Sequence, residues 1–314
     1  IADVNKQLCL DIGTTGRFMT LFCMEISPDN SKATYVRAGH DPAMIYNPVT
    51  GEYVHFLNDP NDPKSISSDS VLSIAQGKDE QLWVGTWSGG LNLLDTQTGQ
   101  FSRIQHSNKS GNKHGLANNN IFRIETLHDG RLLLSVWTLG MQIYDPAANT
   151  FESYFVENNE PTSGIRNSAI NDFAKASANK YWLGGVSGLE LFDVDTKQFT
   201  YHLSEQQVGT IYDVLPTASD EVWLATSNGL VLYNPLTKSV KKYRKADGLS
   251  DNFVVSLERD LYGHIWIGTR TGLSQFKPES QTFQNYDLGD GLAGMQYNRF
   301  SHLKTSTGEI YFGS

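Results

Sequence analysis

One short phrase recurs six times along this chain, and it constrains the fold more than any other feature. Each of the first five copies has a Trp or another apolar residue near the head of a strand, then small residues, a Gly, and a second apolar strand that usually ends in Asp or Asn; only the start of the sixth copy, residues 311–314, is present. The copies begin at positions 83, 133, 182, 223, 266 and 311, so their spacings are 50, 49, 41, 43 and 45 residues. A period of this length is typical of β-propeller blades.

The second copy shows the strands that one blade requires. We predict strands over residues 120–126, 131–136, 141–144 and 150–155, with Asp, Asn, Gly and Pro concentrated in the turns between them. No segment of the repeats carries a helical pattern of ten or more residues, which argues against a helical solenoid. The sequence therefore predicts an all-β fold, a β-propeller of four-stranded blades with five full repeats and partial ones.

The recurring Trp residues have an architectural interpretation. A Trp in the second strand of a blade would pack against the neighbouring blade, and the Gly or Ala two residues later leaves room for that close approach. We expect this role for Trp83, Trp182, Trp223 and Trp266. Because a residue that recurs in nearly every blade serves the architecture, function is expected where the blades differ.

The positions that follow the second strand differ from blade to blade, and they provide the candidate ligand contacts. They are Trp87, Trp137, Val186, Ser227 and Arg270. Propellers bind ligands at the mouth of the central tunnel, where Trp suits stacking on a sugar ring and Arg suits an acidic group. Alternatively, Trp87 and Trp137 only fill the seam between blades. Asn120 and Asn252, which open inner strands, are further candidates, with turn formation as the alternative.

The phrases Leu82-Trp83-Val84-Gly85-Thr86 and Ile265-Trp266-Ile267-Gly268-Thr269 resemble the two-component regulator propeller family, and the resemblance extends over about residues 43–314. It implies an extracytoplasmic, periplasmic sensor region of a membrane-anchored bacterial protein. It also implies a small-molecule or oligosaccharide ligand, a downstream signalling domain such as a histidine kinase, and a homodimer as one arrangement of the parent protein. Family members usually have seven blades, so the ring here is either open or closed by strands near residues 43–57 pairing with the last half-blade.

The first forty residues lack the repeat and read as a small α+β fragment. A helix is expected over residues 3–10, and strands over 18–26 and 33–37. The segments 17–22 and 35–42, the latter with Ala38-Gly39-His40, resemble the C-terminal part of PPM-type serine phosphatases of the sporulation and stress-response group, over residues 1–57. That resemblance implies a metal-dependent phosphatase, but the carboxylates that hold such a metal pair have no clear counterparts here. We therefore expect no catalytic residue on this chain.

These observations divide the chain into three segments. Residues 1–42 are the phosphatase-like fragment, residues 43–64 a junction or the outer hairpin of a partial blade, and residues 65–314 the propeller repeats. The junction is either a natural fusion or an artefact of sequence assembly. Because the first residue is Ile and no secretory signal pattern is present, the chain reads as an excerpt from a longer protein.

Composition excludes several other functions. The formal net charge of −9 argues against a nucleic-acid surface, which needs clustered basic residues. The eight His are scattered without metal-ligand spacing, and phosphate-binding Gly-rich loops are missing, so we expect no metal and no cofactor. Cys9 and Cys23 are the only cysteines, and neither belongs to a CxxC pair. The leading hypothesis is a ligand-sensing module, with a PPM-type phosphatase regulator fragment or a protein-interaction propeller as alternatives.

Overall fold

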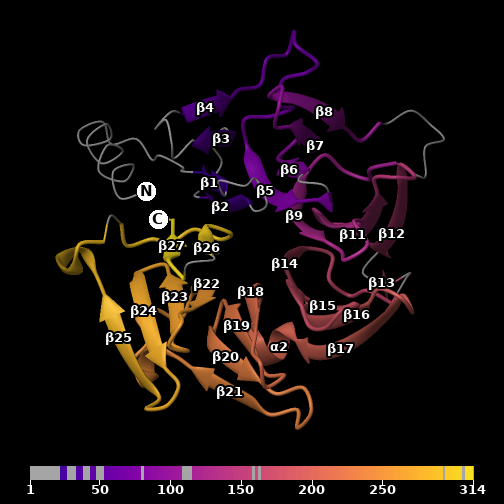
Figure 1. Cartoon of the computed structure of the whole chain (residues 1–314). Helices are drawn as coiled ribbons and strands as arrows, with labels where there is room; N and C mark the ends of the chain where they lie inside the picture. The colour runs from indigo at the N-terminus through magenta and orange to yellow at the C-terminus, as the bar shows by residue number, and fades with distance from the viewer. Residues whose placement is uncertain are drawn as a thin grey trace.

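The structure is a computed structural model, and it describes residues 22–26, 33–37, 43–46, 53–78, 81–107, 115–157, 160–161, 164–292, 294–305 and 308–313. Antiparallel strands account for most of these residues (Figure 1). Within each sheet the strands are neighbours in chain order, which is the meander that a propeller blade requires. The predicted fold class is therefore confirmed.

Five successive sheets form the full blades. The first blade contains β5 (Val71–Gln76), β6 (Leu82–Thr86), β7 (Gly90–Asp95) and β8 (Gln100–Ile104). The second contains β9 (Ile121–Thr126), β10 (Leu132–Val136), β11 (Gly140–Asp145) and β12 (Thr150–Glu157), and β13 (Glu160–Pro161) adds a short fifth strand. The third contains β14 (Ile170–Lys175), β15 (Lys180–Gly185), β16 (Gly188–Asp193) and β17 (Gln198–Ser204). The four strands predicted for the second blade thus lie where expected.

The fourth blade contains β18 (Ile211–Pro216), β19 (Val222–Thr226), β20 (Gly229–Tyr233) and β21 (Val240–Tyr243). The fifth contains β22 (Val254–Arg259), β23 (Ile265–Thr269), β24 (Gly272–Lys277) and β25 (Thr282–Tyr286). Three short helices connect blades: α2 (Glu205–Val208), η2 (Lys245–Asp247) and η3 (Leu288–Asp290). Three two-stranded sheets pair β1 (Phe22–Ile26) with β2 (Ala33–Arg37), β3 (Ala43–Tyr46) with β4 (Tyr53–Phe56), and β26 (His302–Lys304) with β27 (Ile310–Phe312).

The Asp or Asn at the end of the third strand of a blade makes the next turn. The Asp95 carboxylate accepts hydrogen bonds from the backbone N–H groups of Gln97 and Thr98, at 2.9 and 3.1 Å. Asp145, Asp193 and Asn234 do the same in the following three blades. Such a side chain replaces the backbone partner that the turn removes, which explains why the repeat ends in these residue types.

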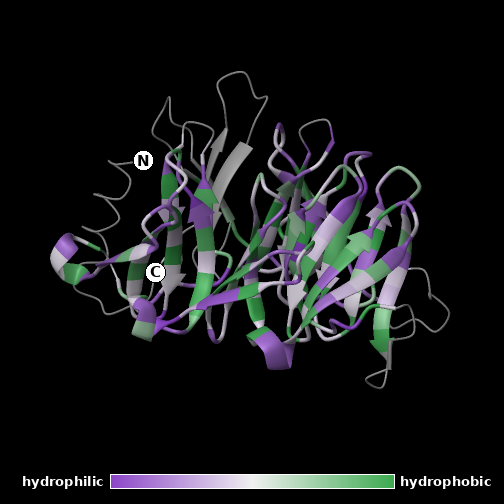
Figure 2. Ribbon diagram, turned by 90° about the horizontal axis from the view of Figure 1, so that it is seen from below, coloured by the Kyte–Doolittle hydropathy of each residue, from purple (hydrophilic) through white to green (hydrophobic). Residues whose placement is uncertain are grey.

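The recurring Trp residues lie in the seams between blades, as predicted. Trp83 is 2% exposed and belongs to a core that includes Ile121 and Ile124 of the next blade. Trp182 and Trp223 are likewise buried with residues of the blades that follow them. Trp266, which faces the two-stranded β26–β27 sheet, is only half-buried. Seen from the side, the blades form a single layer with hydrophobic segments concentrated in the strands (Figure 2).

The first strand of each blade lies closest to the centre, and each of these inner strands contacts the next. The contacts run from β5 to β9, β14, β18, β22 and β26 in order, and β26 then contacts β2, which contacts β5. In Figure 1, β1 to β4 accordingly lie between the first blade and β26. The succession of inner strands therefore returns to its starting point, with β2 in the seventh position.

The pairing of the strands before the repeats differs from one of the predictions. The strands over 43–46 and 53–56 pair with each other, and among the described residues they form no sheet with β26 or β27. The idea that they close a smaller ring by pairing with the last half-blade is therefore wrong. It is β2, paired with β1, that contacts β26. The strand expected over 33–37 is confirmed, the one over 18–26 is β1, and the helix expected over 3–10 lies outside the described residues.

Candidate functional site

The loop after the second strand of a blade is held over the start of that blade's inner strand. The Trp87 N–H donates to the Ser70 carbonyl at 2.8 Å, directly before β5. In the next blade the Trp137 N–H donates to the Asn120 carbonyl at 3.2 Å, directly before β9. Both Trp residues therefore lie at the end of the propeller where the inner strands begin.

Trp87 and Trp137 belong to one group of aromatic rings. Phe122 stacks on Trp137, with 4.4 Å between ring centroids, and the Trp87 ring meets Phe122 edge-on at 5.7 Å. Trp87 is 39% exposed and Phe122 is half-buried, so this group reaches the surface. Exposed flat rings of this kind suit stacking against the face of a sugar or another ring.

Phe122 owes its position to a bulge in the inner strand. The pairing of the first two strands skips one residue at the same place in all five full blades: Leu72, Phe122, Asn171, Tyr212 and Val255. The bulge therefore belongs to the architecture, and it re-aims an aromatic side chain only at Phe122 and Tyr212. Neither residue was predicted as a site residue, because a bulge in a strand has no simple sequence signal.

Arg270 lies in a second group, which joins arginines to aromatic rings. Its guanidinium carbon stands 3.7 Å from the centroid of the Phe253 ring, and Phe253 stacks on Tyr212 at 4.9 Å. The guanidinium of Arg299 lies over the other ring, Tyr212, at 4.0 Å. Both arginines are exposed, while Tyr212 is buried beneath them.

Two adjacent residues join the groups. Arg299 lies on Tyr212, and Phe300 meets Phe122 edge-on at 6.4 Å. Phe300 has a φ of 63°, a left-handed conformation that is uncommon and costly for a bulky side chain. We call the whole set the mouth cluster. It comprises an aromatic side, Trp87, Phe122, Trp137 and Phe300, and an arginine side, Tyr212, Phe253, Arg270 and Arg299.

The two asparagines singled out from the sequence hold loops together. The Asn120 side-chain oxygen accepts from the Ser88 N–H at 2.7 Å and so anchors the residue next to Trp87. The Asn252 side-chain oxygen accepts from the Lys245 N–H at 2.8 Å, and its backbone carbonyl accepts from Gly229. Asn120 therefore positions the aromatic side, whereas Asn252 connects the fourth blade to the fifth.

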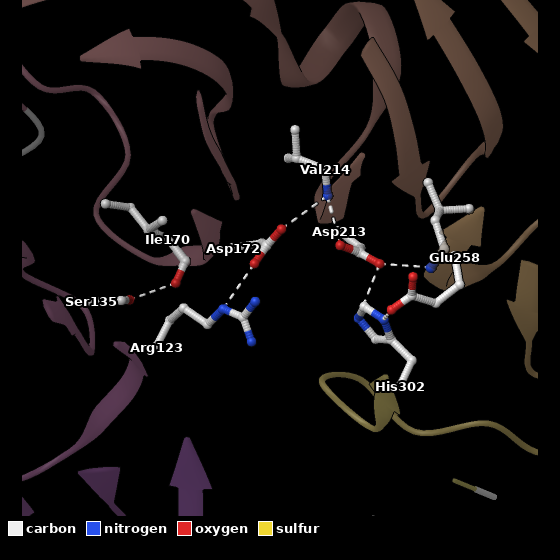
Figure 3. A network of polar contacts seen from close by, with 9 residues as sticks. Arg123, Ser135, Ile170, Asp172, Asp213, Val214, Glu258 and His302 are labelled. Carbon is white, nitrogen blue, oxygen red and sulfur yellow. Dashed lines mark hydrogen bonds and ion pairs between the residues drawn. The ribbon is translucent and has the colours of Figure 1, made fainter. Parts of the chain in front are cut away.

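Next to the mouth cluster, five successive inner strands contribute to a buried ionic network (Figure 3). Its members are Arg123, Asp172, Asp213, Glu258 and His302. Arg123 Nε lies 2.9 Å from Asp172 Oδ1. His302 places Nε2 3.1 Å from Asp213 Oδ2 and Nδ1 3.0 Å from Glu258 Oε1. Since both imidazole nitrogens face carboxylate oxygens, His302 is a protonated imidazolium here.

The network also ties the blades through backbone groups. The Val214 N–H donates to both Asp172 and Asp213, and the Leu257 N–H donates to Asp213 at 2.6 Å. Burial raises the pKa of Asp172 to about 8, against the opposing effect of Arg123. Burial would lower the pKa of His302, but the carboxylates of Asp213 and Glu258 outweigh it and raise that pKa to about 9. These side chains contact one another and backbone groups of neighbouring blades, so we interpret the network as structural.

Metal and membrane elements are not evident in the part of the chain that the structure describes. Within the described ranges, no three His, Cys, Asp or Glu side chains come together as metal ligands. In the same residues, no helix has the length and apolar character needed to cross a membrane.

Comparison with known proteins agrees with both resemblances. The stage II sporulation protein E model matches residues 1–63, and the two-component regulator propeller model matches residues 65–88. Histidine kinase P4 of Formosa agariphila is 26% identical over 213 residues, which cover 66% of this chain. The chain spans about 15% of that kinase's length.

Solved structures share the fold at low sequence identity. The extracellular domain of a hybrid two-component system from B. thetaiotaomicron superposes with a TM-score of 0.75 at 15% identity, over 94% of this chain and 38% of that one. Virginiamycin B lyase of Staphylococcus aureus superposes with a TM-score of 0.67 at 10% identity, over 95% of this chain and 93% of the lyase. The chain is thus a β-propeller that matches the two-component regulator propeller family at its first blade and the sporulation protein E family in the residues before it.

Proposed function

We propose that the chain is the ligand-sensing propeller of a bacterial signal-transduction protein, and that the mouth cluster is its binding site. The observation that carries the proposal is the exposed aromatic and arginine set around the start of the inner strands. Its residues occupy loop and inner-strand positions whose residue type differs between blades, whereas the seam residues recur. A carbohydrate or another small ring-bearing ligand fits this chemistry, because sugar faces stack on Trp.

The location and the parent protein that we propose for this propeller are based on the similar proteins. A histidine kinase contains a related segment, and the superposed hybrid system is an extracellular domain. These support an extracytoplasmic, periplasmic propeller whose parent protein is membrane-anchored and carries a signalling domain. We also propose that residues 1–42, 43–64 and 65–314 are segments of different origin, which the change of matching family near residue 64 supports.

A thermal-shift screen of the intact chain with neutral and acidic oligosaccharides tests the proposal. We expect at least one glycan to raise the melting temperature and Trp137→Ala to abolish that rise. Tyr262→Ala is the matched control, because Tyr262 is 82% exposed in the turn after β22, at the opposite end of that inner strand. If no glycan shifts the melting temperature and the chain instead captures a protein partner, a protein-interaction propeller is the better interpretation.

The match of residues 1–63 to the sporulation protein E family supports a second candidate, a PPM-type phosphatase regulator fragment. We propose that this chain is not itself an enzyme, although the lyase shows that this fold also occurs in enzymes. Manganese-dependent hydrolysis of p-nitrophenyl phosphate by the purified chain would favour the second candidate. We expect no hydrolysis above the rate in buffer alone.

A further inference from the structure

We propose that the ligand of the mouth cluster is acidic, an oligosaccharide whose carboxylate or sulfate groups pair with Arg270 and Arg299 while a ring stacks on the aromatic side. This inference rests on the proposed function and specifies the class of ligand. It is carried by the arginine side of the cluster, where two guanidinium groups lie on a stacked pair of aromatic rings.

The two guanidinium groups are held in place by rings and not by acids. Arg270 lies on Phe253 at 3.7 Å and Arg299 lies on Tyr212 at 4.0 Å, and these two rings stack on each other. A guanidinium that stacks on an aromatic ring keeps its edge N–H donors available, and these donors match the two oxygens of a carboxylate or sulfate.

Neither arginine forms an ion pair with a carboxylate in the described part of the chain. The nearby Asp251 is engaged, because it accepts from the Phe253 N–H at 2.7 Å and from the Thr271 hydroxyl at 3.0 Å. Elsewhere Arg123 and Arg131 each have an aspartate at 2.9 and 2.7 Å. In a chain with 34 acidic and 25 basic residues, two neighbouring arginines without an acidic partner indicate a place for an external anion.

The two positive charges also act on each other. Arg299 is exposed but loses part of its hydration where it packs on Tyr212; this desolvation lowers its pKa, and the charge of Arg270 lowers it further. Like charges held near each other repel, and an anion bound at the arginine side would remove that repulsion. The left-handed backbone at Phe300, next to Arg299, fixes the link between the arginine side and the aromatic side, as expected of a preformed site.

Binding of defined tetrasaccharides to the intact chain, followed by tryptophan fluorescence, tests this inference. The probes are tetragalacturonate, which carries carboxylates, a chondroitin sulfate tetrasaccharide, which carries both groups, and neutral cellotetraose. We expect an acidic probe to bind at least about tenfold more tightly than cellotetraose, and its affinity to fall with added salt. A preference between the two acidic probes shows whether sulfate contributes.

Variants locate the contact. Arg270→Gln and Arg299→Gln should each weaken binding of the acidic probe about tenfold or more, without a change in melting temperature. Arg166→Gln is the matched control, because Arg166 is also exposed and stacks on an aromatic ring, Tyr201 at 4.2 Å, outside the mouth cluster. Its affinity should stay within about twofold of the unmodified chain.

The outcomes separate this inference from the proposed function. If cellotetraose binds as well as the acidic probes and the arginine variants bind normally, the acidic ligand is excluded while the sensing propeller stands. If none of the probes binds, the inference of an acidic oligosaccharide is overturned, and the proposed function is then decided by the broader thermal-shift screen. Tighter binding of a hexaglutamate peptide than of any tetrasaccharide would also overturn the inference, since it would indicate an acidic protein segment as the partner.

Discussion

Single polar side chains hold four of the five full blades to the loops that enter them. The third residue of the third strand accepts from a backbone N–H of that loop in four blades: Asn92 from Ser67, Gln142 from Ala117, Glu190 from Arg166 and Asn167, and Ser274 from Ser250. The repeat alignment shows a polar residue at this place. Its partner could not be predicted, because it lies about 25 residues earlier in a loop whose sequence varies.

Glu190 is the strongest case, and replacing it with Gln should destabilise the third blade. Both of its carboxylate oxygens accept N–H groups at 2.9 Å, and Gln would present an NH₂ group to one set of donors. We expect Glu190→Gln to lower the free energy of unfolding by about 1–3 kcal/mol in urea titrations. Glu279→Gln makes the same charge change at an exposed site and should be neutral; equal effects would contradict this role.

The ionic network makes stability depend on pH above neutrality. The pKa of His302 is raised to about 9 in the folded protein, so its contribution is fully present below its unfolded pKa of about 6.5 and is lost as pH rises through 9. The pKa of Asp172 is raised from 3.8 to about 8, so its contribution to stability already falls from about pH 4 and is lost by about pH 8. We expect urea midpoints to fall from pH 7 to pH 10. His302→Gln should reduce this slope, and an unchanged slope would refute the assignment.

At the scale of elements, the sequence predicted the strands and seams well and the bulges of the inner strands poorly. The phrase around each Trp marks the second and third strands because burial against the next blade demands apolar residues there. Trp87, Trp137 and Arg270 were identified because their positions differ between blades. Phe122, Tyr212 and Arg299 were missed. The side chains of Phe122 and Tyr212 are aimed by bulges in strand pairing, and Arg299 lies in the loop before β26; no local sequence pattern specifies either arrangement.

The seams predict unequal effects for the recurring Trp residues. Trp182 is 5% exposed within a core that spans the third and fourth blades, so Trp182→Ala should cost about 3–5 kcal/mol of unfolding free energy. Trp266 is half-buried, and we expect a clearly smaller loss for Trp266→Ala. Chemical denaturation of the two variants measures both losses. A larger loss for Trp266→Ala than for Trp182→Ala would contradict the inference that burial of the Trp in its seam sets the size of the effect.

At the scale of the whole molecule, the strands before the repeats take part in the propeller. Contact between β2 and β26 joins segments more than 260 residues apart, which no local signal in the sequence could show. Ala43 is 5% exposed and belongs to the core of the first blade, and Phe56 meets Phe101 edge-on at 5.3 Å. The resemblance of this segment to a phosphatase family therefore does not make it independent of the blades.

Removal of residues 1–57 should consequently destabilise the first blade. It takes away Ala43 and Phe56 and leaves Phe101 uncovered. We expect a lower urea midpoint than that of the full chain, and Phe56→Ala alone should cost about 1–3 kcal/mol. A truncated protein as stable as the full chain would mean that these strands do not support the propeller.

The most direct test of the central claim is hydrogen–deuterium exchange of the intact chain with and without a saturating oligosaccharide identified in the binding screen. Recognition at the mouth cluster predicts slower exchange in residues 86–90, 136–140, 268–272 and 298–301, with residues 127–131 and 260–264 at the opposite end unchanged. Protection confined to the opposite end, or absent from the loops that carry Trp87, Trp137 and Arg270, would contradict the assignment of the mouth cluster as the ligand site.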